Sequence, residues 1–145
     1  VAAYDAYTAA SDKVGAAEKA ITDLGYNADG SLTAGKDLFV AKVGVAGTTT
    51  IGAGFATGDE LFIGTQYKFG GATDATKTIG DLYAAGNASA LEVFFEQKGA
   101  DTIVHVETKA FANAGAEPAN DVANIVLTGV NANTLTFENG FVHVA

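Results

Sequence analysis

The sequence predicts a mainly β fold, an antiparallel β-sandwich or barrel-like domain with one α-helix at the N-terminus. Three observations lead to this prediction. Short runs of β-branched and apolar residues recur about every 8–12 residues, glycine-containing breaks separate them, and a helical pattern is confined to the first 25 residues. A chain of 145 residues is expected to form a single domain, with a helix over residues 1–25 and a β-rich body over residues 37–145.

The strongest strand signal is a hairpin in the middle of the chain. Strands are expected at Leu91–Glu96 and Thr102–Lys109, joined by a turn at Gln97–Asp101. In the second strand, the even-numbered residues are threonine and valine and the odd-numbered ones are mostly polar or charged. This period-two pattern is typical of a strand with one buried face.

Other strands are expected on both sides of the hairpin. Those before it are Leu38–Val45, Thr48–Gly52, Glu60–Gly64 and Gln66–Phe69, with a break at Gly70–Asp74. Those after it are Asp121–Val130 and one or two strands within Leu135–Val144. A helical turn is expected at Ile79–Ala85, because Gly86-Asn87 can end it.

The N-terminal helix carries an apolar stripe at coiled-coil spacing. Its members alternate at intervals of three and four residues: Tyr7, Ala10, Val14, Ala17, Ile21 and Leu24. We expect this stripe to pack on the protein's own sheet, since a short seam that includes alanine makes a weak coiled coil. A helix that binds a partner or a second copy is the alternative.

Composition excludes several classes of function. Seventeen acidic residues against eight lysines and no arginine give a net charge of −9, which excludes nucleic acid as a partner. Cysteine is absent, so disulfides and thiolate metal sites are excluded. No apolar run reaches the roughly 20 residues of a membrane span. Because the chain begins at Val1 and contains no methionine, we expect it to be a processed or partial form of a longer protein.

The sequence shows no enzyme signature. No serine lies in a nucleophile elbow. Gly30–Lys36 matches the start of a phosphate-binding loop, but Asp37 stands where a hydroxyl should contact magnesium. His105 and His143 each lie in a Val-His-Val triplet and could hold a metal if their strands were neighbours. Glu92 and Glu96 share one strand face, as solvent-facing carboxylates commonly do. We therefore predict a protein that is not an enzyme.

Calcium is the one cofactor that the sequence leaves open. The loop after the helix resembles the middle of an EF-hand, although Gly25 and Lys36 occupy two positions where ligands belong. A plain turn is the competing interpretation. The candidate ligands are side-chain oxygens in predicted loops, at Asn27, Asp29, Asp59, Asp74, Asp101 and Asp121.

The C-terminal part of the chain resembles a known group of proteins. The segments that carry the resemblance are Gly99–Val104, Asp121 with Ile125–Val130, and the closing Phe141–Ala145. Their order is similar to that in the C-terminal region of type I-secreted, RTX-associated bacterial surface and S-layer proteins. The resemblance implies an extracellular location, a β-rich terminal domain and an uncleaved C-terminal export signal.

The chain departs from that group in one respect. Such proteins usually carry glycine-rich nonapeptide repeats that wind around calcium. The nearest match here, Gly70–Asp74, lacks the third glycine and the register of the repeat. A calcium β-roll is therefore not expected within these residues.

Two functional hypotheses follow. The first is a non-enzymatic structural module of a secreted bacterial surface protein, which assembles with copies of itself into a surface layer, sheath or filament. The alternative is a β-sandwich adhesin or carbohydrate-binding module with surface glycans as partners. That alternative needs an exposed aromatic platform, for which the candidates are Tyr26, Tyr67, Tyr83 and Phe69.

Overall fold

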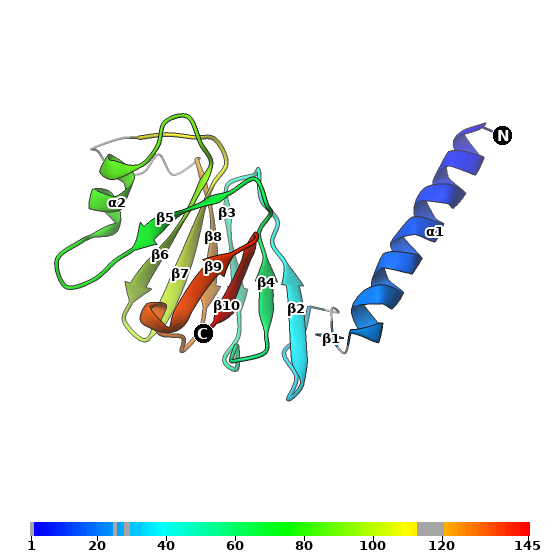
Figure 1. Cartoon of the computed structure of the whole chain (residues 1–145), viewed down its shortest axis with the longest axis horizontal. Coiled ribbons are helices and arrows are strands. Elements are labelled where there is room, and N and C mark those ends of the chain that lie inside the picture. Colours follow the sequence, from blue (N-terminus) through cyan, green and yellow to red (C-terminus); the bar gives the residue numbers. More distant parts are fainter. Residues whose placement is uncertain (1, 25, 28–29, 113–120) are drawn as a thin grey trace.

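The computed structural model describes residues 2–24, 26–27, 30–112 and 121–145. Two five-stranded sheets pack face to face (Figure 1). The first contains, in spatial order, β1 (Tyr26–Asn27), β2 (Lys36–Val40), β4 (Glu60–Phe62), β10 (Phe141–Val144) and β9 (Leu135–Glu138). The second contains β3 (Gly47–Ile51), β8 (Val122–Leu127), β7 (Asp101–Glu107), β6 (Glu92–Lys98) and β5 (Lys68–Ala72). The predicted mainly β sandwich is confirmed, with two open sheets instead of a closed barrel.

The strands pair in both directions, whereas the sequence analysis expected antiparallel pairing. The antiparallel pairs are β6–β7, β7–β8, β4–β10 and β9–β10. The parallel pairs are β1–β2, β2–β4, β3–β8 and β5–β6. Parallel neighbours need a crossover connection. The link from β5 to β6 contains α2 (Ile79–Ala85), and the link from β2 to β4 passes through β3 in the opposite sheet.

The core lies between the inner faces of the two sheets. Each central strand contributes alternate side chains to it, as the period-two pattern requires. The buried members include Val93, Phe95, Val104, Val106, Ile125, Leu127, Leu61 and Val142. This burial fixes which face of each strand points inward, because a slip of one residue would turn all of these apolar side chains to the other face.

Helix α2 covers the outer face of the second sheet, so β6 and β7 are buried on both faces. Thr78 caps the helix: its side chain accepts a hydrogen bond from the Asp81 N–H, and the Asp81 carboxylate accepts one from the Thr78 N–H. Leu82 and Tyr83 of the helix pack on Phe94 of β6 in a second apolar cluster. The polar residues that alternate with apolar ones along β7 predict a side that faces solvent. In the structure that side is covered.

Strand β5 continues through Gly70 and Gly71, where the sequence analysis expected a break. A β-bulge between Phe69 and Gly71 shifts its register against β6. The ring of Phe94 occupies the space that a Cβ on Gly70 would need. Glycine at this position thus marks the close approach of a neighbouring aromatic ring and not the end of the strand.

A two-residue turn joins β9 and β10. Glu138 pairs with Phe141, and the residues between them, Asn139 and Gly140, both have positive φ (53° and 86°). This is the conformation that Asn-Gly favours in hairpins. The short helix η1 (Ala132–Thr134) precedes β9. The predicted closing segment is therefore two strands.

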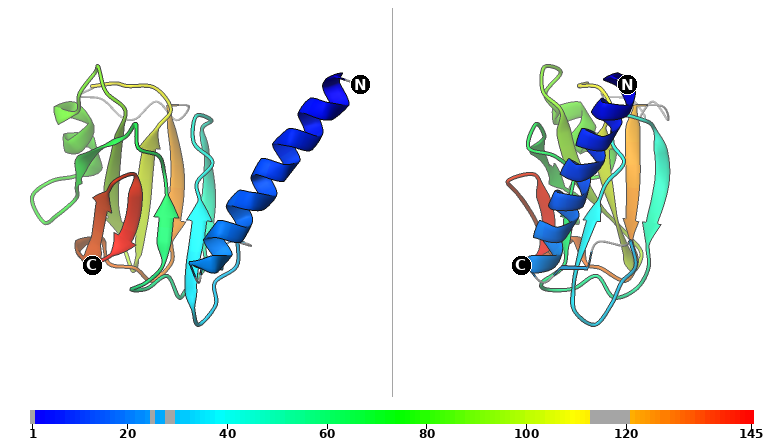
Figure 2. Two further views of the ribbon diagram at one scale, coloured as in Figure 1. Left: turned by 45° about the vertical axis from the view of Figure 1, so that its right-hand side comes forward. Right: turned by 90° about the vertical axis from the view of Figure 1, so that its right-hand side faces the viewer.

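Helix α1 (Ala2–Asp23) projects away from the sandwich (Figures 1 and 2). It contacts mainly β1, and every α1 side chain that the structure describes is exposed. The prediction that the apolar stripe packs on the protein's own sheet is therefore wrong for its described members, Tyr7, Ala10, Ala17 and Leu24, while the side chains of Val14 and Ile21 lie outside the described residues. Within the described ranges, no helix combines the length and the apolar character that crossing a membrane requires.

Candidate functional site

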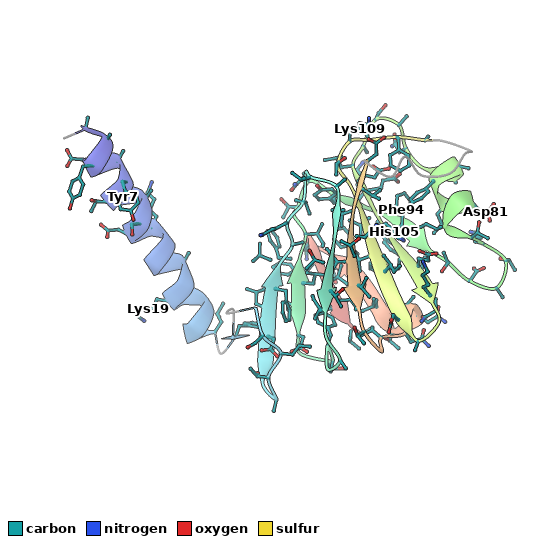
Figure 3. The ribbon with its side chains drawn as sticks, turned by 180° about the vertical axis from the view of Figure 1, so that it is seen from behind. Tyr7, Lys19, Asp81, Phe94, His105 and Lys109 are labelled. Atoms are coloured by element: carbon teal, nitrogen blue, oxygen red, sulfur yellow. The ribbon has the colours of Figure 1, made fainter. Side chains whose placement is uncertain are left out.

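Three side chains form a hydrogen-bonded chain between α2 and the second sheet. The Tyr83 hydroxyl lies 2.9 Å from His105 Nδ1, and His105 Nε2 lies 2.8 Å from Glu96 Oε2. Phe94 and His105 lie side by side on adjacent strands, on the face of the sheet next to α2 (Figure 3). The Tyr83 ring packs edge-on against both of them.

This chain can move a proton in principle, since the imidazole bonds a phenol on one side and a carboxylate on the other. Tyr83 and His105 are nevertheless buried, and Glu96 is the half-buried member through which the chain approaches solvent. The arrangement ties α2 to β7 and β6 through hydrogen bonds that a buried imidazole needs. We interpret it as a structural contact.

A pair of carboxyl groups lies farther along the same two strands. Glu107 Oε2 accepts a hydrogen bond from the Glu92 N–H at 2.8 Å, and Glu92 Oε2 accepts one from the Asn87 N–H at 2.7 Å. The pKa of Glu107 is raised to about 7, mainly by burial and in part by the nearby Glu92 carboxylate, against the opposing effect of hydrogen bonds from the backbone N–H groups of Glu92 and Phe111. Glu107 is therefore largely protonated below neutral pH.

A second histidine cluster lies on the outer face of the first sheet. His143 on β10 is cross-strand partner to both Glu60 and Thr136. Its Nε2 lies 2.8 Å from Thr136 Oγ1, and its Nδ1 lies 3.5 Å from Glu60 Oε2. Burial raises the pKa of Glu60, and the neighbouring His143 opposes that rise. Glu60 and His143 border an apolar hollow of about 480 Å³ that Leu24 and Tyr26 also line.

The two histidines belong to different sheets. His105 is on β7 and His143 is on β10, and each points to the outer face of its own sheet. The hypothesis that their strands are neighbours and hold a metal between them is therefore wrong. The alternation of side chains along a strand predicts which face of the sheet each imidazole occupies. The strand order is also needed to show that the two imidazoles lie in different sheets.

Each described carboxylate among the calcium candidates is already held by a hydrogen bond or ion pair within the protein, and Asp101 lies at the start of β7 and not in a loop. Asp59 is buried and accepts hydrogen bonds from the Asp37 and Ala56 N–H groups. Asp74 accepts bonds from Thr76 and Lys77.

The other described calcium candidates, Asp101 and Asp121, also bind groups within the protein. Asp101 accepts a hydrogen bond from the Gly129 N–H at 2.8 Å, and Asp121 forms an ion pair with Lys109 at 2.8 Å. Asp29 and the side chain of Asn27 lie outside the described residues. In the part of the chain that the structure describes, no three His, Asp or Glu side chains come together as metal ligands.

The loop that resembles a phosphate-binding motif is closed on itself. Asp37, the residue that departs from the motif, is buried, and its carboxylate accepts hydrogen bonds from the N–H and hydroxyl of Thr33. These bonds fold residues 33–37 into a tight turn ahead of β2. The Asp37 carboxylate is therefore used to hold this turn together.

The proposed aromatic platform is not formed by the candidate residues. Tyr67 and Tyr83 are buried, in the main core and under α2 respectively. Tyr26 is half-buried beside Lys36, and Phe69 is exposed and packs at a tilt against Phe95, with the ring centroids 4.9 Å apart. These four rings therefore do not present a common exposed face for a sugar.

Two exposed surfaces of the described residues can serve as contacts with a partner. One is the apolar stripe that begins on α1, in which Tyr7 is 72% exposed and Leu24, just after the end of the helix, is 70% exposed. The other is the edge strand β3, in which Gly47, Thr48, Thr49 and Thr50 are exposed. Beside β3 a groove of about 580 Å³ opens between the sheets, lined by both apolar and polar side chains that include Phe39, Ile51 and Thr50.

The sequence matches no protein-family model and no curated protein. The features that bear on function are therefore these surfaces and the resemblance of the C-terminal segments. The Tyr83–His105–Glu96 chain was missed at the sequence level because Tyr83 and His105 are 22 positions apart and belong to different kinds of element. The alternation of polar residues in β7 was the one available signal, and it indicated solvent.

Proposed function

We propose that this chain is a non-enzymatic structural module of a secreted bacterial surface protein, and that it assembles with copies of itself into a layer, sheath or filament. The observation that carries the proposal is the exposed α1, on which the described members of the apolar stripe, Tyr7, Ala10 and Ala17, are all exposed to solvent. The extracellular setting follows from the resemblance of the C-terminal segments and is part of the proposal.

The physical chemistry of α1 supports a partner for it. A helix of 22 residues is about 33 Å long. A helix gains most of its stability in proteins from packing its apolar face, because isolated helices are marginal in water. Ala10 and Ala17 lie on the stripe with Tyr7 and Leu24, and all four are exposed. A second copy offers the same stripe, so that two helices would bury each other's apolar residues.

The test is the oligomeric state of two matched double variants. Ala10→Asp with Ala17→Asp places two charges on the stripe. Ala9→Asp with Ala16→Asp places the same charges on exposed positions of the same two turns, away from the stripe. We expect the first variant to weaken association at least tenfold and the second to leave it close to that of the unmodified chain. Light scattering over a range of concentrations, with negative-stain microscopy, measures this.

The possible results distinguish a specific role of the apolar stripe from a general effect of added charge. A purely monomeric unmodified chain at high concentration would overturn the proposal. Equal weakening by both variants would show that added negative charge, and not the stripe, controls association. Circular dichroism of each variant establishes whether its helix is retained.

A further inference from the structure

We infer that β3 is a second self-association surface, where the β3 strands of two copies pair antiparallel across a twofold axis and join their sheets into one. This inference rests on the proposed self-assembly and names a contact for it. The occupant is a second copy of this chain, and the pairing surface is the free edge of Gly47–Ile51.

The other sheet edges carry features that obstruct pairing, and β3 carries none of them. Proteins protect edge strands with charges, bulges, short length or covering elements. β5 has Lys68, a bulge and contacts with α2. β9 has Glu138, and β1 is two residues long beside α1. β3 is a regular five-residue strand with three consecutive threonines, a β-branched residue that favours strands.

Charge favours this edge as the meeting point of two copies. The chain carries a net charge of −9, so copies repel each other over most of their surface. Residues 43–58, which contain β3, include no charged side chain, and neither does β8 beside it. Two copies can therefore approach at β3 without placing like charges opposite each other.

The backbone of β3 defines the register. The Ile51 carbonyl accepts a hydrogen bond from Thr128 at the end of β8, so Ile51 and Thr49 direct their backbone groups toward β8. Because these groups alternate in direction along a strand, Thr48 and Thr50 direct theirs toward the free edge. Among the described residues, no strand pairs with that edge.

A twofold axis at Thr49 then matches Thr48 of each copy with Thr50 of the other. Each such pair exchanges two backbone hydrogen bonds, which gives four bonds across the axis. The Thr48 and Thr50 side chains lie on the outer face and form cross-strand threonine pairs, which are favourable. The result is a ten-stranded sheet made from two five-stranded ones.

Two different twofold contacts on one molecule have a consequence for assembly. A copy that joins one neighbour through α1 and another through β3 extends the assembly at both ends. Either contact alone stops at a dimer. The pair of contacts therefore provides for the extended layer or filament in the proposed function.

The test uses charge pairs that only the antiparallel register brings together. Thr48→Lys with Thr50→Lys places lysine opposite lysine at both pairs across the axis. Thr48→Glu with Thr50→Lys places opposite charges at the same pairs and leaves the net charge of the chain that carries them unchanged. Both positions are exposed, so the fold of the monomer tolerates either change.

Both variants are made in the chain that already carries Ala10→Asp and Ala17→Asp, so that β3 is the contact under test. We expect a dimer with native β3, a dimer with the Glu/Lys combination and a monomer with the Lys/Lys combination, by light scattering. Hydrogen exchange of the Thr48 and Thr50 amides should slow at least tenfold in the dimer, while the Thr49 amide is unchanged.

The oligomeric states of these chains show whether copies associate through α1, through β3 or through both. A monomer in all three chains, from a parent that associates through α1, would overturn the β3 contact and leave the proposed function standing. A dimer in all three would also overturn it. If the α1 variant has no effect and the Lys/Lys combination alone produces monomer, β3 is the contact and the role proposed for α1 fails.

Discussion

The hydroxyl of Tyr83 lies 2.9 Å from Nδ1 of His105, and this bond connects α2 to the middle of β7. Both residues are buried, and they come from elements that lie 22 positions apart in the chain. The contact explains how a seven-residue helix, too short to be stable alone, keeps a defined place on the sheet.

Tyr83→Phe should destabilise the domain by about 1–3 kcal/mol, because it leaves a buried imidazole nitrogen without this bond while the ring packing is kept. Thermal or urea unfolding measures the change. Tyr4→Phe, which removes a hydroxyl from a ring that is 72% exposed, is the control and should change stability by less than about 0.5 kcal/mol. Equal effects of the two substitutions would contradict the structural role of Tyr83.

Glu107 should make the domain less stable as pH rises from about 4.5 to about 7. The folded protein holds the pKa of this carboxyl at about 7, mainly through burial, whereas its ordinary value is 4.5. In that window the unfolded chain releases the proton and the folded chain keeps it, so stability falls with pH and then levels off.

Glu107→Gln cannot ionise and should flatten this dependence. The loss of stability between pH 5 and 8 should shrink by on the order of 1–3 kcal/mol relative to the unmodified chain. Glu138→Gln, at an exposed position on β9, is the control and should leave the slope unchanged. An unaltered slope in the Glu107 variant would show that this carboxyl does not titrate as inferred.

Gly140→Ala should be far more disruptive than Gly129→Ala. Both glycines have positive φ, 86° and 72°, so alanine is strained at either position by about 1 kcal/mol. A Cβ at Gly140 would also meet the backbone of Gly64 and Thr65 at 2.7–2.9 Å, whereas a Cβ at Gly129 has open space. We expect a further loss of about 1–3 kcal/mol at Gly140, measured by urea unfolding. Equal losses of stability at the two positions would mean that the backbone at Gly64 and Thr65 moves away from residue 140 at little cost.

Calcium can act on assembly in two ways, through general screening or through a bound ion. Repulsion between copies of net charge −9 weakens as ionic strength rises, so sodium chloride should strengthen association. We expect calcium chloride at equal ionic strength to have the same effect, because the described carboxylate candidates lie apart. Light scattering of matched salt series measures this. A larger effect of calcium, abolished by chelator, would instead place a bound ion at the contacts.

Strand positions were largely predictable from the sequence. The hairpin around Gly99 and the strands at β3, β4 and β8 are found within a few residues of their predicted bounds. The helical turn at Ile79–Ala85 is found with those bounds. These features depend on local patterns of apolar residues and on glycine, which act over a few neighbouring residues.

Two local signals were misread because a distant neighbour changes their meaning. Gly70 looked like a break, but it is the space for the Phe94 ring within a continuing strand. Glu107 looked solvent-facing from the alternation in β7, but the α2 side of the sheet is covered and the side chain is fully buried.

The sequence by itself determined the fold class, the approximate strand positions, the N-terminal helix and the acidic, arginine-free surface, because each follows from composition or from short-range periodicity. Only the tertiary structure decided strand order and direction, the separation of His105 from His143, and the exposure of α1 and β3. The physical reason is that a period of two or of 3.6 identifies the apolar face of an element, while the surface that covers that face comes from residues far away in the chain.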